Sequence, residues 1–535
     1  MRLLRTSSAL NAWLGDHQRG PRGERWRPLH FVPTMGALHR GHQTLITRAA
    51  QPKGDQVPRV LVSVFVNPLQ FGPGEDLERY PRQLEADAAL AAEAGAEAVF
   101  APSVPELYPE GEQGLTRVRP PVQLLESLCA RQRPGHFEGV ATVVCRLLAL
   151  VRPQRLFLGE KDWQQLVILR RVIRDLALPL TVEGVATVRE TDGLALSSRN
   201  RYLDPEQRQR ASRLPALLAE AARRFQAEAL PIELLQDWLT TQLQAAQLVP
   251  QYVEVVGPHT LRPHPGRQGL SLLAVAVQCG PARLIDHRFL MTRAPIVAID
   301  GPAGAGKSTV TRAFADRLGL IMLDTGAMYR AVTWWVQQQG ADPADEGAVQ
   351  PLLEGLNLQL SRSPATGEQI VSINGHEVTA AIRSPEVTAL VSVVAAHPCV
   401  RQALTAQQQR LGAEGGLVAE GRDIGTAVFP DAELKVFLTA TVAERARRRA
   451  ADLAERGFAV PSLAELEAQI AERDHLDSTR AVAPLCQAAD AAELITDGLS
   501  IEAVIQRLVD LFRERVPEEV WPDPAPAGPQ ASSPS

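Results

Sequence analysis

The chain has 535 residues, of which 45% are hydrophobic and 22% are charged, and its formal net charge is −5 with a pI near 6.2. This length exceeds what one hydrophobic core supports, so we expect three or four structural units of ordinary globular composition. The small negative charge is a weak argument against nucleic acid or an anionic membrane as the main partner.

The five cysteines are scattered along the chain and form no C-x-x-C pair. This pattern is typical of reduced, mostly buried thiols and not of a metal site or a disulfide framework. The N-terminus carries arginines but lacks the long apolar stretch of a secretory signal. No apolar run reaches the ~20 residues of a membrane span. We therefore expect a cytoplasmic protein that binds neither membrane nor nucleic acid.

Short apolar runs alternate with helical patterns in the first part of the chain, which predicts an α/β fold with a parallel sheet. Residues 15–27 are expected to form a loop. The expected strands are 29–32, 60–66, 98–101 and 156–158, and the expected helices include 43–50, 85–94 and 163–176.

A smaller α+β unit is expected after this sheet, with a helical stretch at 205–247 and strands at 252–256 and 272–277. Only residues 291–294 separate it from the next strand, and so short a linker indicates apposed domains.

The second half is expected to run from 295 to 516 and to contain a hairpin of strands 356–360 and 370–373. The tail, 517–535, is rich in Pro, Ala and Ser and is expected to be disordered.

An H-x-x-H pair follows the first long apolar strand, where residues 32–42 read VPTMGALHRGH. If a helix begins near Gly41, both imidazoles lie at its positive end and face one site. Histidine donors at a helix N-terminus suit a polyphosphate and a developing pentacoordinate phosphorus, and either ring is able to donate a proton near pH 7. Taken alone the pair is a weak signal, because a capping or core role is equally expected.

Four further segments follow in order: FVNPLQFG at 65–72, RQRPGHFEGV at 131–140, GEKDWQQ at 159–165 and DGLALSSRN at 192–200. With the histidine pair they resemble pantothenate synthetase (pantoate–β-alanine ligase) over about residues 1–290. The resemblance implies a Rossmann-like domain over 1–190 and a smaller domain over 191–290. It also implies that ATP activates pantoate as pantoyl adenylate with release of pyrophosphate, and that β-alanine then displaces AMP.

The same resemblance implies the site residues of this half. His42 is the expected proton donor and belongs with His39, Lys161 and Arg199 to the expected catalytic group. Gln70, Gln165 and Asn67 are expected to bind substrate. The expected ATP site consists of Met35, Gly36, Ala37, Leu38, His39, Arg40, Gly41, His42, Gly159, Glu160, Lys161, Asp162, Val188, Leu196, Ser197, Ser198 and Arg199.

These residue types suit the reaction, because Lys161 and Arg199 neutralise phosphates while neutral glutamines hold pantoate without repelling its carboxylate. Structural alternatives remain open. Asp162 and Gln165 have capping-box spacing at a helix start, and the two serines at 197 and 198 also suit an ordinary turn.

The metal-binding segment departs from the family pattern of adjacent acidic residues, since residues 84–87 read LEAD. Asp87 remains the candidate Mg²⁺ contact, whereas Ala86 replaces its neighbour. The alternative is that ATP phosphates and water hold most of the metal.

A glycine-rich phosphate-binding pattern opens the second half, where residues 301–308 read GPAGAGKS after the apolar run PIVAID. Backbone N–H groups of such a loop cradle phosphates at a helix N-terminus, Lys307 adds a positive charge, and the Ser308 hydroxyl suits Mg²⁺. The context disfavours a chance glycine-rich turn.

Five later segments narrow the class: LDTGAMYR at 323–330, EGRDIGT at 420–426, FPD at 429–431, ERARRR at 444–449 and RDHLDSTRA at 473–481. The ordered set resembles bacterial cytidylate kinase, a P-loop nucleoside monophosphate kinase, over residues 295–516. That resemblance implies transfer of the γ-phosphoryl group of ATP to CMP or dCMP. Numerous arginines fit, because such catalysis consists mainly of positioning and charge neutralisation.

The residues implied for the kinase fall into two groups, with Lys307 and Asp423 as the expected catalytic pair. The ATP-binding group is Gly301, Gly304, Gly306, Lys307, Ser308, Thr309, Arg445, Arg448 and Arg449, the last three in a mobile lid whose alternative is a solvated basic helix face. The CMP-binding group is Thr325, Arg330, Ser392, Arg401, Arg422, Asp423, Arg473, Asp477 and Arg480, and on a continuing helix Arg473 and Arg480 share one face.

The sequence thus predicts two enzymes in one chain, acting on ATP with Mg²⁺, pantoate, β-alanine and CMP or dCMP. The product of one reaction is not a substrate of the other, so we do not predict channelling. Two alternatives are another adenylyl transferase or a UMP kinase, and a non-catalytic nucleotide-binding scaffold. The substrate glutamines, Ser392 with Arg401, and the retained charged residues argue against these. A homodimer through the ligase half is a further expectation from the resemblance.

Overall fold

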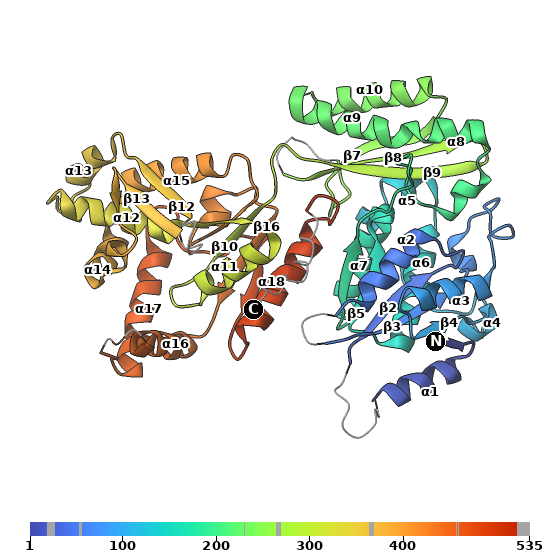
Figure 1. The fold of residues 1–535 in the computed structure, drawn as a ribbon, viewed down its shortest axis with the longest axis horizontal. Coiled ribbons are helices and arrows are strands. Elements are labelled where there is room, and N and C mark those ends of the chain that lie inside the picture. Colours follow the sequence, from blue (N-terminus) through green and yellow to red (C-terminus); the bar gives the residue numbers. More distant parts are fainter. Residues whose placement is uncertain are drawn as a thin grey trace, which may run out of the picture. The chain divides into compact units, whose positions relative to one another are not determined.

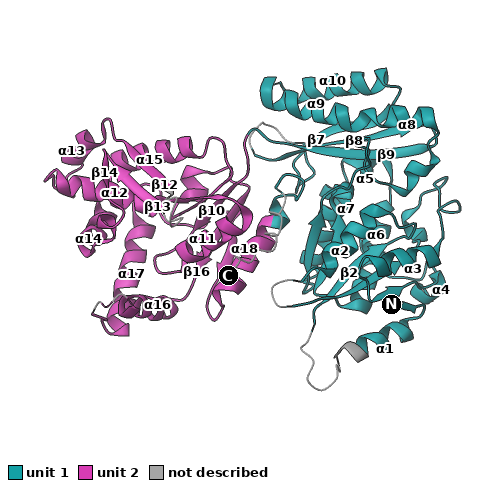
Figure 2. Ribbon diagram, viewed as in Figure 1, with its two compact units in different colours: residues 1–292, 513–522 teal, residues 293–512, 523–535 magenta. Residues whose placement is uncertain are grey.

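The structure is a computed structural model that describes residues 1–18, 27–52, 56–228, 230–263, 269–362, 369–455, 457 and 459–521. The chain divides into two compact units, which Figure 2 shows in different colours. Unit 1 consists of Met1–Thr292 and Arg513–Pro522, and the rest of the described chain, from Arg293 to Phe512, belongs to unit 2. Each unit contains a parallel sheet flanked by helices (Figure 1), so the predicted α/β class is confirmed.

The first part of unit 1 is a six-stranded parallel sheet with the order β1-β4-β3-β2-β5-β6. All four predicted strands are present. The edge strands β1 and β6 were not predicted, because β1 has only three residues and β6 is mostly half-buried. The strands are β1 (Arg2–Leu4), β2 (Leu29–Thr34), β3 (Arg59–Val64), β4 (Ala98–Phe100), β5 (Arg155–Gly159) and β6 (Thr181–Val185).

Helices cover this sheet and end close to their predicted limits. The predicted loop at 15–27 is wrong at its start, because α1 continues to Gln18; residues 19–26 lie outside the described residues. The helices of this part are α1 (Ser7–Gln18), α2 (Arg40–Ala50), α3 (Leu84–Glu93), α4 (Val104–Leu107), α5 (Leu128–Gln132), α6 (His136–Val151) and α7 (Trp163–Asp175).

The second part of unit 1 is an antiparallel sheet of three strands with a separate apolar core. The single helical stretch predicted at 205–247 is three helices, two of which lie along one face of the sheet (Figure 1). Its elements are α8 (Pro205–Ala211), α9 (Arg213–Glu228), α10 (Ile232–Ala245), β7 (Val249–Val256), β8 (Ser271–Cys279) and β9 (Ala282–Leu290).

Unit 2 is built on a five-stranded parallel sheet with the order β11-β15-β10-β16-β17. The predicted hairpin is present as β12 and β13, and β14 extends it to three strands. The strands are β10 (Ile296–Asp300), β11 (Ile321–Asp324), β12 (Leu358–Arg362), β13 (Gln369–Ile373), β14 (His376–Glu377), β15 (Leu417–Gly421), β16 (Leu434–Thr439) and β17 (Ala492–Ile495).

The helices of unit 2 begin with α11, which follows the glycine loop directly. Across the described ranges no single helix is long and apolar enough to cross a bilayer; α14 and α15 meet that test only together and are bent by 99°. The helices are α11 (Lys307–Leu318), α12 (Thr325–Gln338), α13 (Glu346–Val349), α14 (Pro385–Val394), α15 (Pro398–Leu411), α16 (Val442–Glu455), α17 (Leu463–Thr479) and α18 (Ile501–Arg515). The last three residues of α18, from Arg513 onward, belong to unit 1.

The disorder predicted from residue 517 onward does not hold for residues 517–521. Pro517 is buried, the Glu518 and Glu519 backbones donate hydrogen bonds to Glu160, and Val520 packs against the core of unit 1. A short apolar and acidic run can be ordered by a surface elsewhere in the chain, which its own composition does not reveal. Residues 522–535 lie outside the described residues.

Candidate active sites

The histidine pair of unit 1 lies at the start of α2. His39 is the N-cap, and its Nδ1 accepts the Gly41 N–H at 3.2 Å, while the His42 Nδ1 accepts the His39 N–H at 3.3 Å. The two ring centroids are 4.2 Å apart, and both rings line the same cavity. Capping and a place in the site, which the sequence left as alternatives, are therefore both present in the structure.

The turn before α2 is held by Asp87, a side chain from α3 that is only 1% exposed. Its two carboxylate oxygens accept the N–H groups of Ala37 at 3.0 Å and Leu38 at 2.8 Å. Gly36 has φ +83°, and a Cβ atom there would lie 2.9 Å from Asp87 Oδ2. Asp87 does not line the cavity, so its predicted Mg²⁺ contact stays a prediction while its structural contact with the turn is evident.

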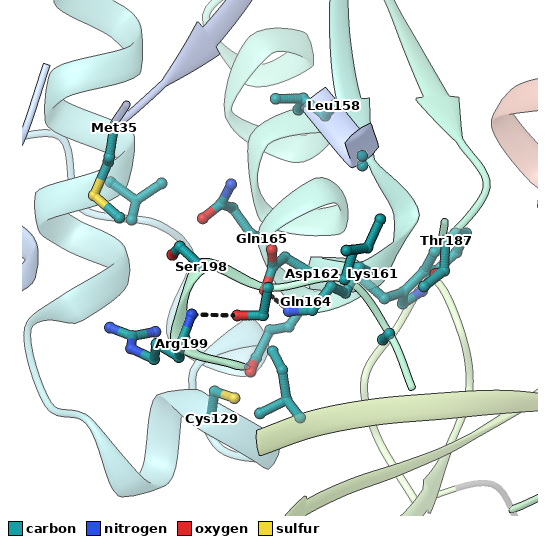
Figure 3. Close-up of a pocket in the computed structure, with 18 of the residues that line it drawn as sticks. Met35, Cys129, Leu158, Lys161, Asp162, Gln164, Gln165, Thr187, Ser198 and Arg199 are labelled. Atoms are coloured by element: carbon teal, nitrogen blue, oxygen red, sulfur yellow. Dashed lines mark hydrogen bonds and ion pairs between the residues drawn. The ribbon is translucent and has the colours of Figure 1, made fainter. Parts of the chain in front are cut away.

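A cavity of about 320 Å³ in unit 1 gathers most of the residues predicted for ATP and substrate. Ten residues of its lining are drawn and labelled in Figure 3. The predicted residues that line it are Met35, His39, Gly41, His42, Asn67, Gln70, Gly159, Lys161, Asp162, Gln165, Val188, Leu196, Ser197, Ser198 and Arg199.

Five residues predicted for the ATP site do not line the cavity: Gly36, Ala37, Leu38, Arg40 and Glu160. The first two form the turn above Asp87, and Leu38 belongs to an apolar core. Arg40 donates to the Arg189 carbonyl at 2.6 Å, and the Glu160 carboxylate bonds the C-terminal segment. Neighbours in a turn or at a helix start point in different directions, so the prediction that these five residues contact ATP stays a prediction.

The predicted substrate side chains are held by neutral hydrogen bonds. Gln70 Nε2 donates to Met35 Sδ at 2.8 Å, and Asn67 Nδ2 donates to Gln70 Oε1 at 3.1 Å. Asp162 is the N-cap of α7 but makes no side-chain cap bond, so the capping box with Gln165 is not formed. Gln165 is therefore available to the cavity.

Two ion pairs at the cavity involve residues to which the sequence assigned no role. Arg199 is bidentate to Asp76, at 3.1 and 3.0 Å, and Arg133 pairs with Glu75. His136 donates from Nδ1 to the Gln70 carbonyl at 2.7 Å. Arg133 and His136 belong to a segment quoted for the resemblance, which could have indicated them; the carboxylates of residues 75 and 76 carried no comparable sequence signal.

The glycine loop of unit 2 surrounds a buried lysine. Lys307 Nζ donates to the carbonyls of Gly301 at 2.7 Å and Pro302 at 2.8 Å. Ser308 Oγ donates to Glu420 Oε1 at 2.6 Å, whereas the buried Glu420 Oε2 has no hydrogen-bond partner among the described residues. Glu420 stands at the start of a quoted segment but was not predicted as a site residue.

Two arginines of α16 contact the glycine loop. Arg445 donates to the Ala303 carbonyl at 3.1 Å, and Arg448 donates to the Ala305 carbonyl at 3.3 Å. Arg449 instead bonds Asp452 and is exposed. The solvated-face interpretation of this basic run thus describes Arg449 but not the other two.

An arginine–aspartate network lies beside the loop. Asp423 pairs with buried Arg401 and lies 3.6 Å from Arg480, while Asp477 accepts from Arg422 at 3.0 Å. Since Arg480 also lies 3.9 Å from Asp477, ion pairs and hydrogen bonds connect all five side chains into one network.

The other residues predicted to bind CMP lie outside this arginine–aspartate network. Thr325 donates to the Glu420 carbonyl at 2.7 Å, and Arg330 bonds Asp324. Arg473 has a buried Nε without a hydrogen-bond partner among the described residues. Half-buried Ser392 is joined to the network by no described hydrogen bond. The helix does not continue through Arg480, because α17 ends at Thr479, so the condition under which Arg473 and Arg480 would share a helix face is not met.

Comparison with known proteins separates the chain at the same place as the two resemblances. Residues 2–289 match the family model of pantoate-beta-alanine ligase, and residues 297–514 match that of cytidylate kinase. A "Bifunctional pantoate ligase/cytidylate kinase" of Parasynechococcus marenigrum (strain WH8102) is 64% identical and covers 93% of this chain and 97% of its own. The chain belongs to this bifunctional family. We therefore call unit 1 the ligase unit and unit 2 the kinase unit.

Two further similar proteins carry related names. A protein of the same description from Prochlorococcus marinus (strain MIT 9303) is 65% identical over 92% of this chain and 100% of its own. A crystal structure of pantothenate synthetase from Thermus thermophilus is 45% identical, covers 54% of this chain and 99% of its own, and has a TM-score of 0.48.

Burial controls the charge states in the ligase cavity. It lowers the pKa of His39 to about 4, with help from the Lys161 cation, and that of His42 to about 3, with help from His39. Both rings are therefore neutral near pH 7. Because each Nδ1 accepts a backbone N–H, the proton of each neutral ring lies on Nε2.

Burial acts in the opposite sense on acids of the kinase unit. It raises the pKa of Asp300 to about 6 and that of Glu420 to about 7, the latter also through nearby Asp324. Burial, with the Arg422 cation, holds the pKa of Lys307 well below its usual value. At the glycine loop, burial therefore disfavours the charged forms of both Lys307 and Glu420. Bound phosphate would stabilise the lysine cation, and a bound metal ion would stabilise the glutamate anion.

Proposed function

We propose that the ligase unit condenses pantoate with β-alanine through pantoyl adenylate, and that the kinase unit phosphorylates CMP or dCMP with ATP. The first reaction gives pantothenate, AMP and pyrophosphate, and the second gives CDP or dCDP and ADP. The observation that carries the proposal is the meeting, in one cavity, of the histidine pair, Lys161 and Arg199 with the neutral amides of Asn67, Gln70 and Gln165.

In the ligase unit, ATP would place its phosphates at the positive end of α2. The Nε2–H groups of His39 and His42 would donate to phosphate oxygens, and Lys161 would balance their charge. The pantoate carboxylate, oriented by the glutamines, then attacks the α-phosphorus and pyrophosphate leaves. In the second step the β-alanine amine attacks the acyl carbon, the acyl–oxygen bond to AMP breaks, and the amide forms.

Arg199 has to change partners in this cycle. Its bidentate bond to Asp76 means that the guanidinium is already neutralised before ATP binds. Two oxygens of a tetrahedral phosphate can accept the same bidentate pair of N–H bonds as the carboxylate, so ATP would compete directly with Asp76 for this arginine.

In the kinase unit, Lys307 would exchange the carbonyls of Gly301 and Pro302 for the ATP phosphates. The network of Arg401, Arg422 and Arg480 with Asp423 and Asp477 would hold the acceptor nucleotide, so that its phosphate oxygen attacks the γ-phosphorus and ADP leaves.

Mg²⁺ is part of the proposal for both reactions. In the kinase unit the residues fit it, because the Ser308 hydroxyl and the unpartnered Glu420 Oε2 are hard oxygen donors beside the phosphate loop. The ion would supply charge neutralisation of the phosphates. In the ligase unit, no cluster of three acidic, histidine or cysteine side chains suited to a metal occurs among the described residues. We therefore propose that ATP phosphates and water hold most of that ion.

We also propose that the chain is cytoplasmic and that it forms a homodimer through the ligase unit. Light scattering on the purified full-length chain tests the dimer, and a chain that is monomeric at every concentration measured contradicts it.

The function is tested with the purified full-length chain, ATP and Mg²⁺. We expect AMP formation that requires both pantoate and β-alanine, and ADP formation that requires CMP, with UMP as the control acceptor. AMP formation without pantoate, or ADP formation with UMP equal to that with CMP, would contradict the respective assignment.

A further inference from the structure

Glu160 interrupts a run of cavity residues, because Gly159, Lys161 and Asp162 line the ligase cavity and Glu160 does not. Its side chain is 1% exposed. One carboxylate oxygen accepts the Glu518 N–H at 2.8 Å and the other accepts the Glu519 N–H at 3.2 Å. A carboxylate in the loop beside Lys161 is thus satisfied by the backbone of residues near the C-terminus.

The same C-terminal stretch is anchored by donors from the ligase sequence. Arg170 of α7 donates to the carbonyls of Glu514 at 3.0 Å and Arg513 at 3.2 Å, and His259 donates to the Arg515 carbonyl at 2.8 Å. These carbonyls belong to the last turn of α18, where no helical partner is available. Ligase side chains therefore complete the end of this helix.

Charge complementarity adds to these bonds. The Glu518 carboxylate pairs with Arg48 of α2 and accepts the Ala186 N–H at 3.1 Å. The Glu519 carboxylate lies 2.9 Å from Arg288 and 3.9 Å from Arg189. Two adjacent acidic residues thus meet three arginines of the ligase unit. We call residues 513–521 the docking segment.

The docking segment lies behind the cavity wall and not in the cavity. Its residues are absent from the lining, whereas Lys161, Ala186 and His287, which lie beside its contacts, are part of the lining. His287 Nε2 is 3.7 Å from the Glu519 carboxylate. A segment in this place does not block ATP but supports the wall against which ATP would bind.

We propose that the docking segment, although it follows the kinase sequence, is a working part of the ligase ATP site, and that Glu160 is the positioning residue through which it holds Lys161 and Asp162. This inference rests on the ligase reaction proposed above. If the segment is removed, the buried Glu160 carboxylate loses both of its donors, and a buried unsatisfied carboxylate is costly enough to force the loop to rearrange toward water.

The decisive comparison uses two shortened chains. One ends at Val516 and lacks the outer part of the docking segment; its matched control ends at Trp521 and lacks only the residues after it. The first should raise the ligase KM for ATP by about 10- to 100-fold, the usual consequence of a small misplacement of binding groups. The KM for β-alanine and the kinase constants should be unchanged in both chains.

A conservative variant separates positioning from folding. Glu160→Gln keeps the shape, but its amide nitrogen is unable to accept a backbone N–H, so the KM for ATP should rise while the kinase activity stays the same and the ligase unit still unfolds in a cooperative transition. The matched control is Glu233→Gln, an exposed glutamate of α10 in the same unit, which should have no effect. In hydrogen exchange, the amides of residues 159–162 should exchange faster in the chain ending at Val516 than in its control.

The outcomes distinguish the two proposals. A full-length chain that makes no pantothenate contradicts the proposed function itself. A full-length chain that is active, with the same KM for ATP in both shortened chains and in the Glu160 variant, overturns the role of the docking segment. If the chain ending at Val516 fails to fold, the Glu160→Gln kinetics decide.

Discussion

At the scale of single residues, the two histidines show how a backbone hydrogen bond selects a chemical role. Each Nδ1 of His39 and His42 accepts an N–H from the first turn of α2, so each neutral ring presents its remaining proton from Nε2. Burial keeps both rings neutral, with pKa values of about 4 and about 3. We therefore expect the pair to act through directed hydrogen bonds more than through net charge.

Replacing His42 with alanine tests that role. We expect kcat/KM for pantothenate formation to fall by about 10²- to 10³-fold, as for loss of one preorganised donor to a developing phosphate charge. CMP phosphorylation by the same preparation, measured as CDP formed, should be unaffected. An unchanged rate of pantoate adenylation would exclude His42 from the reaction.

The reciprocal change is Lys307→Ala in the kinase unit. Loss of the only lysine side chain that the described glycine loop carries should reduce CMP phosphorylation to near background, because its charge is needed on the phosphates. Pantothenate formation should remain at the level of the unaltered chain. If either this change or the histidine change abolishes both activities, the two sites are not independent.

At the scale of elements, α2 depends on a carboxylate from another helix. Asp87 of α3 satisfies the N–H groups of Ala37 and Leu38, which lie in the turn that brings the histidines to the cavity. Ala37 itself has φ +51°, a conformation that an L-residue adopts only when its surroundings hold it. The turn is thus maintained by a residue from a distant part of the sequence.

Asp87→Asn distinguishes this structural contact from metal binding. The amide keeps the shape but leaves one of the two N–H groups without an acceptor, so we expect the ligase unit to lose about 1–3 kcal/mol of stability in denaturant without Mg²⁺. Activity should fall because the turn is disturbed. Recovery of full activity at high Mg²⁺, with stability unchanged, would instead favour Asp87 as a metal contact.

The elements also show which features of the fold can be predicted from the sequence. Strands β2, β3 and β5 and the glycine loop were predicted because each is a local pattern, an apolar run or a fixed glycine spacing. The contacts of Asp87, Asp76 and Glu160 were not, since each joins segments that are far apart in the chain. Most residues that the resemblance assigned to the ATP and substrate sites line one cavity, whereas the side chains of Glu160 and Arg40 bond other parts of the chain; their roles stay predictions.

At the scale of the whole molecule, the two units hold buried groups whose proton binding has opposite effects. In the ligase unit, burial lowers histidine pKa values below the unfolded value of about 6.5, so the unfolded state binds more protons and stability falls as the pH drops. In the kinase unit, raised acid pKa values make the folded state bind more protons, and stability rises as the pH drops from 7. The histidines are His39, His42, His136 and His259, and the acids are Asp300 and Glu420.

Calorimetry of the substrate-free chain at about pH 7.5 and about pH 5.5, on either side of the unfolded histidine pKa, tests this difference. The ligase transition should move down, by at least about 3 °C, and the kinase transition should move up. Glu160, whose pKa burial raises to about 7, opposes the histidines but is outnumbered. Lys307, whose pKa burial lowers, opposes the two acids of the kinase unit and is likewise outnumbered. Added CMP identifies the kinase transition by stabilising it. Movement of both transitions in the same direction would contradict the prediction.

The position of the docking segment has a consequence for how the protein is made. Residues 1–292 emerge from the ribosome long before residues 513–521 are translated, yet both segments belong to one compact unit. The ligase fold can form early, but the Glu160 carboxylate accepts the N–H groups of Glu518 and Glu519 only after the kinase has been translated. On the proposal made above, a nascent chain interrupted anywhere in the kinase would carry a ligase with a raised KM for ATP, so that full affinity for ATP is reached only on chains that have been translated through the docking segment.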